Sequence, residues 1–164
     1  MNVTLEVNGR AQTWETAPGE LLIDTLRLHG YYGVKRGCET GDCGACTVLL
    51  DGRAVNACVT FTGTAAGRRV LTIEGLASPE RLHPIQEAFL DGGAVQCGFC
   101  TPGMILLAKV LLDGNPHPTE GEVRKALGGI LCRCTGYRKP VEAILAAAQR
   151  MRPAKGASAG RKGG

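Results

Sequence analysis

Aromatic residues are scarce in this chain of 164 residues: they make up 4% of it, with a single tryptophan, Trp14. Glycine, with 24 residues, is about twice as frequent as in average proteins. The length suits one domain or two small ones. The composition disfavours a large aromatic core and favours loops that wrap around something other than side chains. We expect Trp14 to anchor the core of the N-terminal half.

Groups that activate substrates are also few. The three histidines, His29, His83 and His117, are scattered along the chain, and no serine–histidine or paired-carboxylate constellation accompanies them. His83 and His117 each precede a proline, and we expect structural or solvated roles for both. His29 follows a predicted helix, where an imidazole is favourable. The chain is therefore predicted to hold no catalytic site of its own.

Long apolar runs are missing too. None approaches the roughly 20 residues of a membrane helix, and residues 1–7 lack the basic and apolar regions of a signal peptide. From Arg150 onward the charged residues are all basic, while the remaining 14 basic and 15 acidic residues nearly cancel. We therefore expect a cytoplasmic protein with no membrane or nucleic-acid partner, and a disordered tail over 152–164.

Cysteine, in contrast, is abundant. The first four of eight lie at C-x4-C-x2-C spacing, with the fourth after eleven intervening residues: Cys38, Cys43, Cys46 and Cys58. This is the plant-type spacing for a [2Fe–2S] cluster. The interleaved glycines allow positive φ and close backbone approach, so that N–H groups can point at sulfur. With no export signal, the cysteines favour metal ligation over disulfides. Zinc, which prefers C-x2–4-C pairs, fits this set less well.

The other four cysteines form a C-x2-C pair and, after 31 intervening residues, a C-x-C pair: Cys97, Cys100, Cys132 and Cys134. Spacing alone favours an iron–sulfur cluster, with structural zinc and redox-active thiols as open alternatives. Helix N-termini are predicted to follow Cys100 and Cys134. Their partial positive charge would help to keep the thiols deprotonated.

The first half of the chain has the patterns of a small sheet. Two strands around the Asn8-Gly9 turn, a helix that Gly30 ends, a hairpin and a late strand are predicted at 3–7, 10–16, 21–28, 47–56 and 70–74. Together they indicate an α+β unit with one helix packed across a sheet. Residues 75–79, rich in turn formers, are predicted to be a linker.

The second half changes to helical periodicity. Helices are predicted at 83–91, 102–113, 119–128 and 140–151. Thr101 before Pro102 is a good N-cap, and Thr119 with Glu122 forms a capping box. Short connections between the helices favour a domain of four packed helices.

Three segments carry a family resemblance: Gly-Cys-Glu-Thr-Gly-Asp-Cys-Gly-Ala-Cys-Thr-Val from Gly37, Gln-Cys-Gly-Phe-Cys-Thr-Pro-Gly-Met from Gln96, and Cys-Arg-Cys-Thr-Gly-Tyr from Cys132. The chain, over residues 1 to about 150, resembles the iron–sulfur subunit of the molybdenum hydroxylases, the family of xanthine dehydrogenase, aldehyde oxidoreductase and carbon monoxide dehydrogenase. The resemblance implies a plant-ferredoxin-like β-grasp domain over 1–76 and a four-helix-bundle domain over 77–151. Each domain would hold one [2Fe–2S] cluster, the second on Cys97, Cys100, Cys132 and Cys134.

The resemblance also implies partners. In this family a separate large subunit carries the molybdenum–pterin cofactor and performs the chemistry, and usually a medium subunit carries FAD, in an assembly expected to be a dimer of heterotrimers. Electrons run from molybdenum to the cluster of the helical domain, then to the ferredoxin-like cluster, then to FAD or an external acceptor. Gln96 matches a glutamine that lies against the pterin.

One departure and two rival functions stand beside this interpretation. Ile130-Leu131 precedes Cys-Arg-Cys, where family members commonly have Asn-Leu, which puts a polar contact near the second cluster in doubt. A free-standing ferredoxin-like electron carrier and a zinc-binding structural module are the alternatives to an electron-transfer subunit. Without a fused FAD or pterin domain, we expect the chain to act in a complex.

Overall fold

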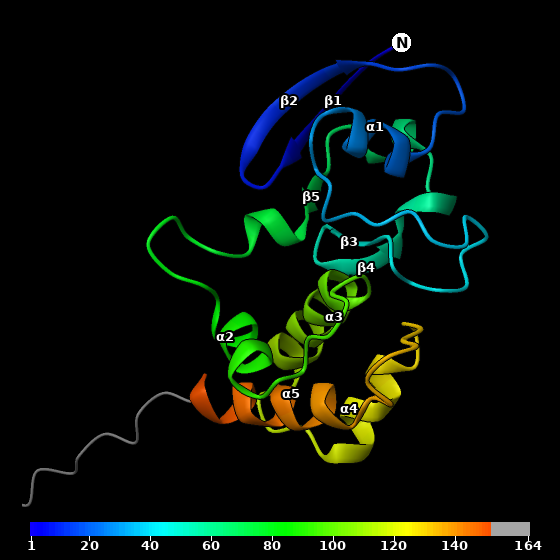
Figure 1. The fold of residues 1–164 in the computed structure, drawn as a ribbon. Helices are drawn as coiled ribbons and strands as arrows, with labels where there is room; N and C mark the ends of the chain where they lie inside the picture. Colours follow the sequence, from blue (N-terminus) through cyan, green and yellow to red (C-terminus); the bar gives the residue numbers. More distant parts are fainter. Residues whose placement is uncertain (152–164) are drawn as a thin grey trace, which may run out of the picture.

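A five-stranded sheet with one covering helix forms the N-terminal half of the chain (Figure 1). The computed structural model describes residues 1–151. The strands are β1 (Asn2–Val7), β2 (Arg10–Glu15), β3 (Thr47–Leu50), β4 (Arg53–Asn56) and β5 (Arg69–Leu71). Their order is β2-β1-β5-β3-β4, in which β1 and β5 are parallel and the other pairs antiparallel.

Helix α1 (Leu22–Leu28) lies on one face of this sheet because its apolar residues recur at helical spacing. Leu22, Ile23 and Leu26 are fully buried, and they share a core with the inward side chains of β1 and β3. Trp14 is buried in the same core, and its ring stacks on His29 at 4.2 Å. The predicted anchoring role of Trp14 is confirmed.

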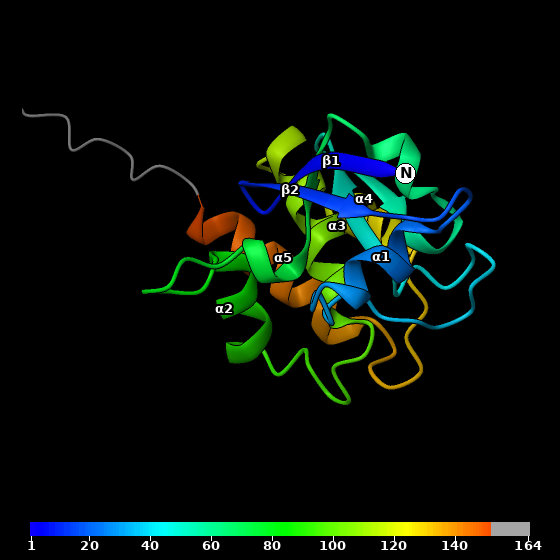
Figure 2. The same cartoon turned by 90° about the horizontal axis from the view of Figure 1, so that it is seen from above.

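Four helices form the C-terminal half: α2 (Pro84–Asp91), α3 (Thr101–Gly114), α4 (Glu120–Leu127) and α5 (Arg138–Arg150). They share a second core, centred on Phe89, Met104 and Ile144. α2 packs on α5 and α3 on α4, while α3 also reaches β3 and β4 of the sheet half. Figure 2 shows the same arrangement from above. Within residues 1–151, no helix has the length and apolarity to cross a bilayer.

Helix caps follow the local sequence closely. The predicted capping box at the start of α4 is present, with Thr119 accepting from the Glu122 N–H and the Glu122 side chain accepting from the Thr119 N–H. His83 caps α2: its Nδ1 accepts from the Ile85 N–H, and Gln86 completes the box. His83 is thus structural, as expected.

Most boundaries differ from the predicted ones by one or two residues, and three differences have a clear physical reason. The strand predicted over 70–74 ends at Leu71, because Thr72 is hydrogen-bonded to a side chain instead of to a strand. Asn8 (φ +52°) follows β1, and its side chain accepts from the Thr72 N–H and donates to the Thr72 hydroxyl. Cys100, not Thr101, is the N-cap residue of α3, because Thr101 is already the first residue of the helix. α5 starts at Arg138, four residues after Cys134, because Tyr137 lies in the left-handed region. The predicted tail, 152–164, lies outside the described residues.

Candidate iron–sulfur sites

The first cysteine loop runs from Cys38 to Cys46 between α1 and β3. Gly41 and Gly44 have φ of +87° and +68°, which glycine adopts most cheaply. The resulting turns aim N–H groups at sulfur: Cys43 N donates to Cys38 Sγ at 3.3 Å, and Cys38 N to Cys43 Sγ at 3.4 Å. Thr40 N also donates to Cys38 Sγ, at 3.4 Å. Such bonds stabilise thiolate and help to set a cluster's reduction potential.

The other two cysteines of this set, Cys46 and Cys58, are buried side by side in the core of the sheet half. Cys46 ends the loop before β3, and Cys58 lies in the short 3₁₀ helix Ala57–Val59 after β4. Burial raises the pKa of Cys46 to about 12. In contrast, hydrogen bonds from the Thr40 hydroxyl and from the Cys43 and Thr40 N–H groups lower the pKa of Cys38 to about 5. The loop thus offers one outer and one inner pair of thiols.

The second set is contributed by two connections, that between α2 and α3 and that between α4 and α5. Cys97 and Cys134 are exposed, with their sulfurs 3.5 Å apart. Cys100 is buried against Cys132, and burial raises the pKa of Cys100 to about 12. This set also consists of an outer and an inner pair.

The arrangement of the thiols in pairs indicates which metal group the two sites can hold. Within the described residues, no three histidine, cysteine or acidic side chains converge on a point that could hold a single ion. A structural zinc site requires four ligands around one ion, whereas the four cysteines of a [2Fe–2S] cluster are shared between two irons. Two neighbouring pairs in each set therefore fit a two-iron cluster better than zinc.

Tyr137 holds the loop of the second set in place. Its hydroxyl accepts from the Cys132 N–H at 2.8 Å and donates to the Ile130 carbonyl at 3.0 Å. Thr135 Oγ1 lies 3.1 Å from Cys132 Sγ and accepts from the Tyr137 N–H. Sequence reasoning included Tyr137 in a motif but missed this role. The role depends on the left-handed backbone of Tyr137 (φ +66°), a conformation that is rare for a bulky residue and that the sequence does not reveal.

We predict that Tyr137→Phe selectively weakens the second metal site. The variant leaves the Cys132 N–H and the Ile130 carbonyl without their partner, at a cost of about 1–3 kcal/mol. Loss of such an outer contact typically lowers metal affinity about 10–100-fold. In a chelator challenge followed by electron paramagnetic resonance (EPR), the second cluster's signal should decay faster than in the unmodified chain. Tyr32→Phe, at an exposed tyrosine, is the control, and equal acceleration of both signals would contradict the prediction.

Gln96, Ile130 and Leu131 are the other residues that the sequence singled out near the second cysteine set. Gln96 is exposed next to the exposed Cys97, so its side chain is available to a neighbouring molecule. Ile130, which replaces the family's asparagine, is fully buried in the helical core, and its apolar side chain makes no polar contact there, although its carbonyl accepts from Tyr137. Leu131 is exposed, but its N–H donates to the Cys43 carbonyl at 2.9 Å. This bond joins the two cysteine loops directly.

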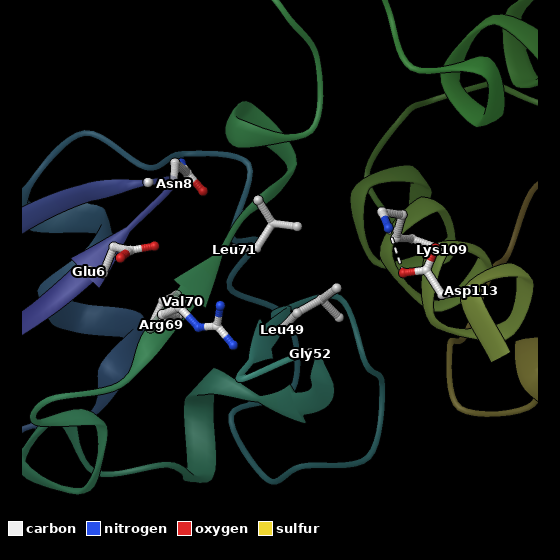
Figure 3. Close-up of a pocket in the computed structure, with 10 residues that line it drawn as sticks. Glu6, Asn8, Leu49, Gly52, Arg69, Val70, Leu71, Lys109 and Asp113 are labelled. Atoms are coloured by element: carbon white, nitrogen blue, oxygen red, sulfur yellow. Dashed lines mark hydrogen bonds and ion pairs between the residues drawn. The ribbon is translucent and has the colours of Figure 1, made fainter.

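A pocket of about 270 Å³ lies away from both cysteine sets, between the sheet and α3 (Figure 3). Glu6 and Arg69 line its sheet side, while Lys109 and Asp113 form an ion pair on the facing helix. The pocket holds no histidine, serine or cysteine that would act as a nucleophile or base. None of the eight cysteines lines this pocket, so it is no part of either candidate cluster site.

Two domain families match the chain in tandem. The 2Fe-2S iron-sulfur cluster binding domain matches residues 5–69, and the [2Fe-2S] binding domain matches residues 72–145. These ranges correspond to the sheet half and the helical half and contain the two cysteine sets. The chain accordingly carries two [2Fe–2S] clusters.

Characterised relatives agree over nearly the whole chain. The nicotinate dehydrogenase small FeS subunit of Eubacterium barkeri is 46% identical over 151 residues, which cover 92% of this chain and 96% of that subunit. The xanthine dehydrogenase iron-sulfur-binding subunit of Escherichia coli is 43% identical over 148 residues, which cover 87% of this chain and 92% of that subunit.

Solved structures show the same fold. A chain of quinoline 2-oxidoreductase from Pseudomonas putida 86 superposes with a TM-score of 0.88 at 41% identity, covering 91% of this chain and 94% of that one. Aldehyde oxidoreductase from Desulfovibrio desulfuricans superposes with a TM-score of 0.87 at 46% identity over 92% of this chain, but only 17% of that longer chain. The chain therefore belongs to the iron–sulfur small subunits of the molybdenum hydroxylase family.

Proposed function

We propose that this chain relays electrons from a molybdenum–pterin site in a partner large subunit, through its second and then its first cluster, to FAD or an external acceptor. The observation that carries the proposal is the Leu131 N–H to Cys43 carbonyl hydrogen bond of 2.9 Å. It joins the residue before Cys132 to a cysteine of the first loop, so the two clusters are neighbours in one packed unit. The clusters supply the one-electron chemistry, and the chain supplies spacing, burial and hydrogen bonds.

The proposed ligands are the two cysteine sets. Cys38, Cys43, Cys46 and Cys58 would hold the first cluster in a β-grasp domain over 1–76. Cys97, Cys100, Cys132 and Cys134 would hold the second in a four-helix bundle over 77–151. The pairs also give the path a direction: the exposed sulfurs of Cys97 and Cys134 face outward, while Cys132 lies next to the residue that contacts the first loop. The outer pair would receive electrons from the partner.

The partner proposal draws on the relatives. Two of them are named as subunits of a nicotinate dehydrogenase and a xanthine dehydrogenase, and the aldehyde oxidoreductase carries its matching segment within a much longer chain. We infer a large molybdenum–pterin subunit and a medium FAD subunit, assembled with this chain as a dimer of heterotrimers. Because thiols stay reduced there, the cytoplasm is the proposed compartment for cluster assembly.

Co-purification combined with spectroscopy tests this function. Isolated under mild conditions, the chain should bring with it a larger subunit that contains molybdenum, and nucleotide analysis should find FAD in a third. Reduction should produce two distinguishable [2Fe–2S] EPR signals. A monomeric, coloured protein without molybdenum would instead identify a free-standing carrier. A protein colourless between 400 and 550 nm would refute the iron–sulfur function altogether.

Gln96 is proposed to contact the pterin of the large subunit. We expect Gln96→Ala to slow the reduction of both clusters by substrate about 10-fold, as for an outer contact at a metal site, and to leave their reduction by dithionite unchanged. Stopped-flow absorbance measures both rates. Gln149→Ala, at an exposed position on α5, is the matched control. Substrate-driven rates that are equal in the two variants would exclude the contact.

A further inference from the structure

Three glycines and one isoleucine lie where the two cysteine loops meet. Gly44 belongs to the first loop, Gly103 to the first turn of α3, and Gly129 with Ile130 to the connection after α4. We call this group the glycine seam: Gly44, Gly103, Gly129 and the side chain of Ile130. Ile130 is fully buried, and its Cδ1 lies against both Gly44 and Gly103.

Gly103 leaves no room for a side chain. A Cβ at this position would lie 2.8 Å from the Gly44 carbonyl oxygen and 2.9 Å from Ile130 Cδ1. The Gly44 carbonyl is not free to withdraw, because it accepts from both Thr47 N at 3.0 Å and Thr47 Oγ1 at 2.7 Å. Thr47 in turn begins β3. A methyl group at position 103 must therefore push the first loop and α3 apart.

Gly44 likewise leaves no room for a side chain. Its φ is +68°, and a Cβ there would overlap the Gly129 carbonyl oxygen and approach Ile130 Cδ1 at 2.5 Å. Next to it, the Cys43 carbonyl accepts from the Leu131 N–H. The first loop is thus clamped between two segments that each lead to an inner cysteine of the second set. Gly103 comes three residues after Cys100, and Leu131 immediately precedes Cys132.

We propose that the glycine seam sets the separation of the two clusters, and that Gly44 and Gly103, where a Cβ would clash, are positioning residues for electron transfer between them. This inference rests on the relay proposed above and adds the feature that fixes the distance between its two clusters. Electron tunnelling slows steeply with distance, and packed interiors transmit a displacement to their neighbours instead of absorbing it. Missing side chains at the seam let the backbones that carry the clusters come into direct contact.

The test compares two glycines of the same helix. Gly103→Ala adds a methyl group at the seam, whereas Gly114→Ala adds one at the other end of α3, where nothing lies within 4 Å. Each variant is purified with the subunits that accompany it and fully reduced with dithionite. The magnetic coupling between the two reduced clusters then reports their separation, because its dipolar part falls with the inverse cube of the distance. We expect a smaller splitting of the EPR signals in Gly103→Ala and an unchanged splitting in Gly114→Ala.

A second variant keeps the test decisive if Gly103→Ala does not take up iron. Gly103→Ala combined with Ile130→Val removes the Cδ1 contact and keeps the close approach of 2.8 Å to the Gly44 carbonyl, so a reduced splitting is still expected. Equal splitting in the seam variants and in Gly114→Ala would overturn the proposal. That result would leave the relay intact, since the relay is judged by substrate-driven reduction and by the partners found with the chain.

Discussion

Replacing Cys43 by serine is expected to abolish the first cluster and turnover with the physiological acceptor, while substrate still reduces the second cluster. Removal of an outer contact alone typically costs about 10–100-fold in metal affinity or activity, so loss of a ligand should lower turnover by more than about 100-fold. The second site should survive because its link to this loop uses the Cys43 carbonyl, a backbone group that serine retains.

Two measurements define the outcome for Cys43→Ser. EPR of the dithionite-reduced protein should show one of the two cluster signals, and addition of substrate should produce that same signal. Val59→Ser is the control, because it introduces serine next to Cys58, at an exposed position, without removing a thiol. If Cys43→Ser kept full turnover with its acceptor, electrons would have to leave by a path that bypasses the first loop.

Local patterns predicted much of the fold. The β3–β4 hairpin forms where Asp51 and Gly52, both with positive φ, make the expected turn. The predicted helices appear with boundaries shifted by a few residues, because apolar periodicity and caps are encoded within each segment. The late strand was less well predicted. Its end depends on Asn8, which is more than 60 residues away in sequence, and local patterns do not include that contact.

The sequence predicted the cysteines of each site but not their arrangement in space. Cysteine spacing indicated two metal sites, and the described structure brings Cys97 close to Cys134 although 36 residues separate them. Which thiols become inner or outer depends on how the core of each half packs, and spacing contains no such information. The same holds for Gly44 and Gly103. In sequence both resemble ordinary loop or helix-start glycines, and only the contact between two distant segments explains why a side chain is excluded there.

Replacing Cys134 by serine should interrupt the relay at its entrance. Neither cluster should then be reduced by substrate, although dithionite should still reduce the first. Turnover should again fall by more than about 100-fold. Because Cys134 is exposed, its replacement opens no cavity in the helical core, so the fold and the first site should be retained.

Comparing Cys134→Ser with Cys43→Ser determines the order of the clusters. In the proposed order, substrate reduces the surviving cluster of Cys43→Ser but not that of Cys134→Ser. If the first loop faced molybdenum instead, the two results would be exchanged. Arg133→Ser is the control, since it changes the exposed residue between Cys132 and Cys134 and leaves all eight thiols in place. Rapid-freeze EPR after mixing with substrate distinguishes these outcomes, because it records which cluster signal develops in each variant.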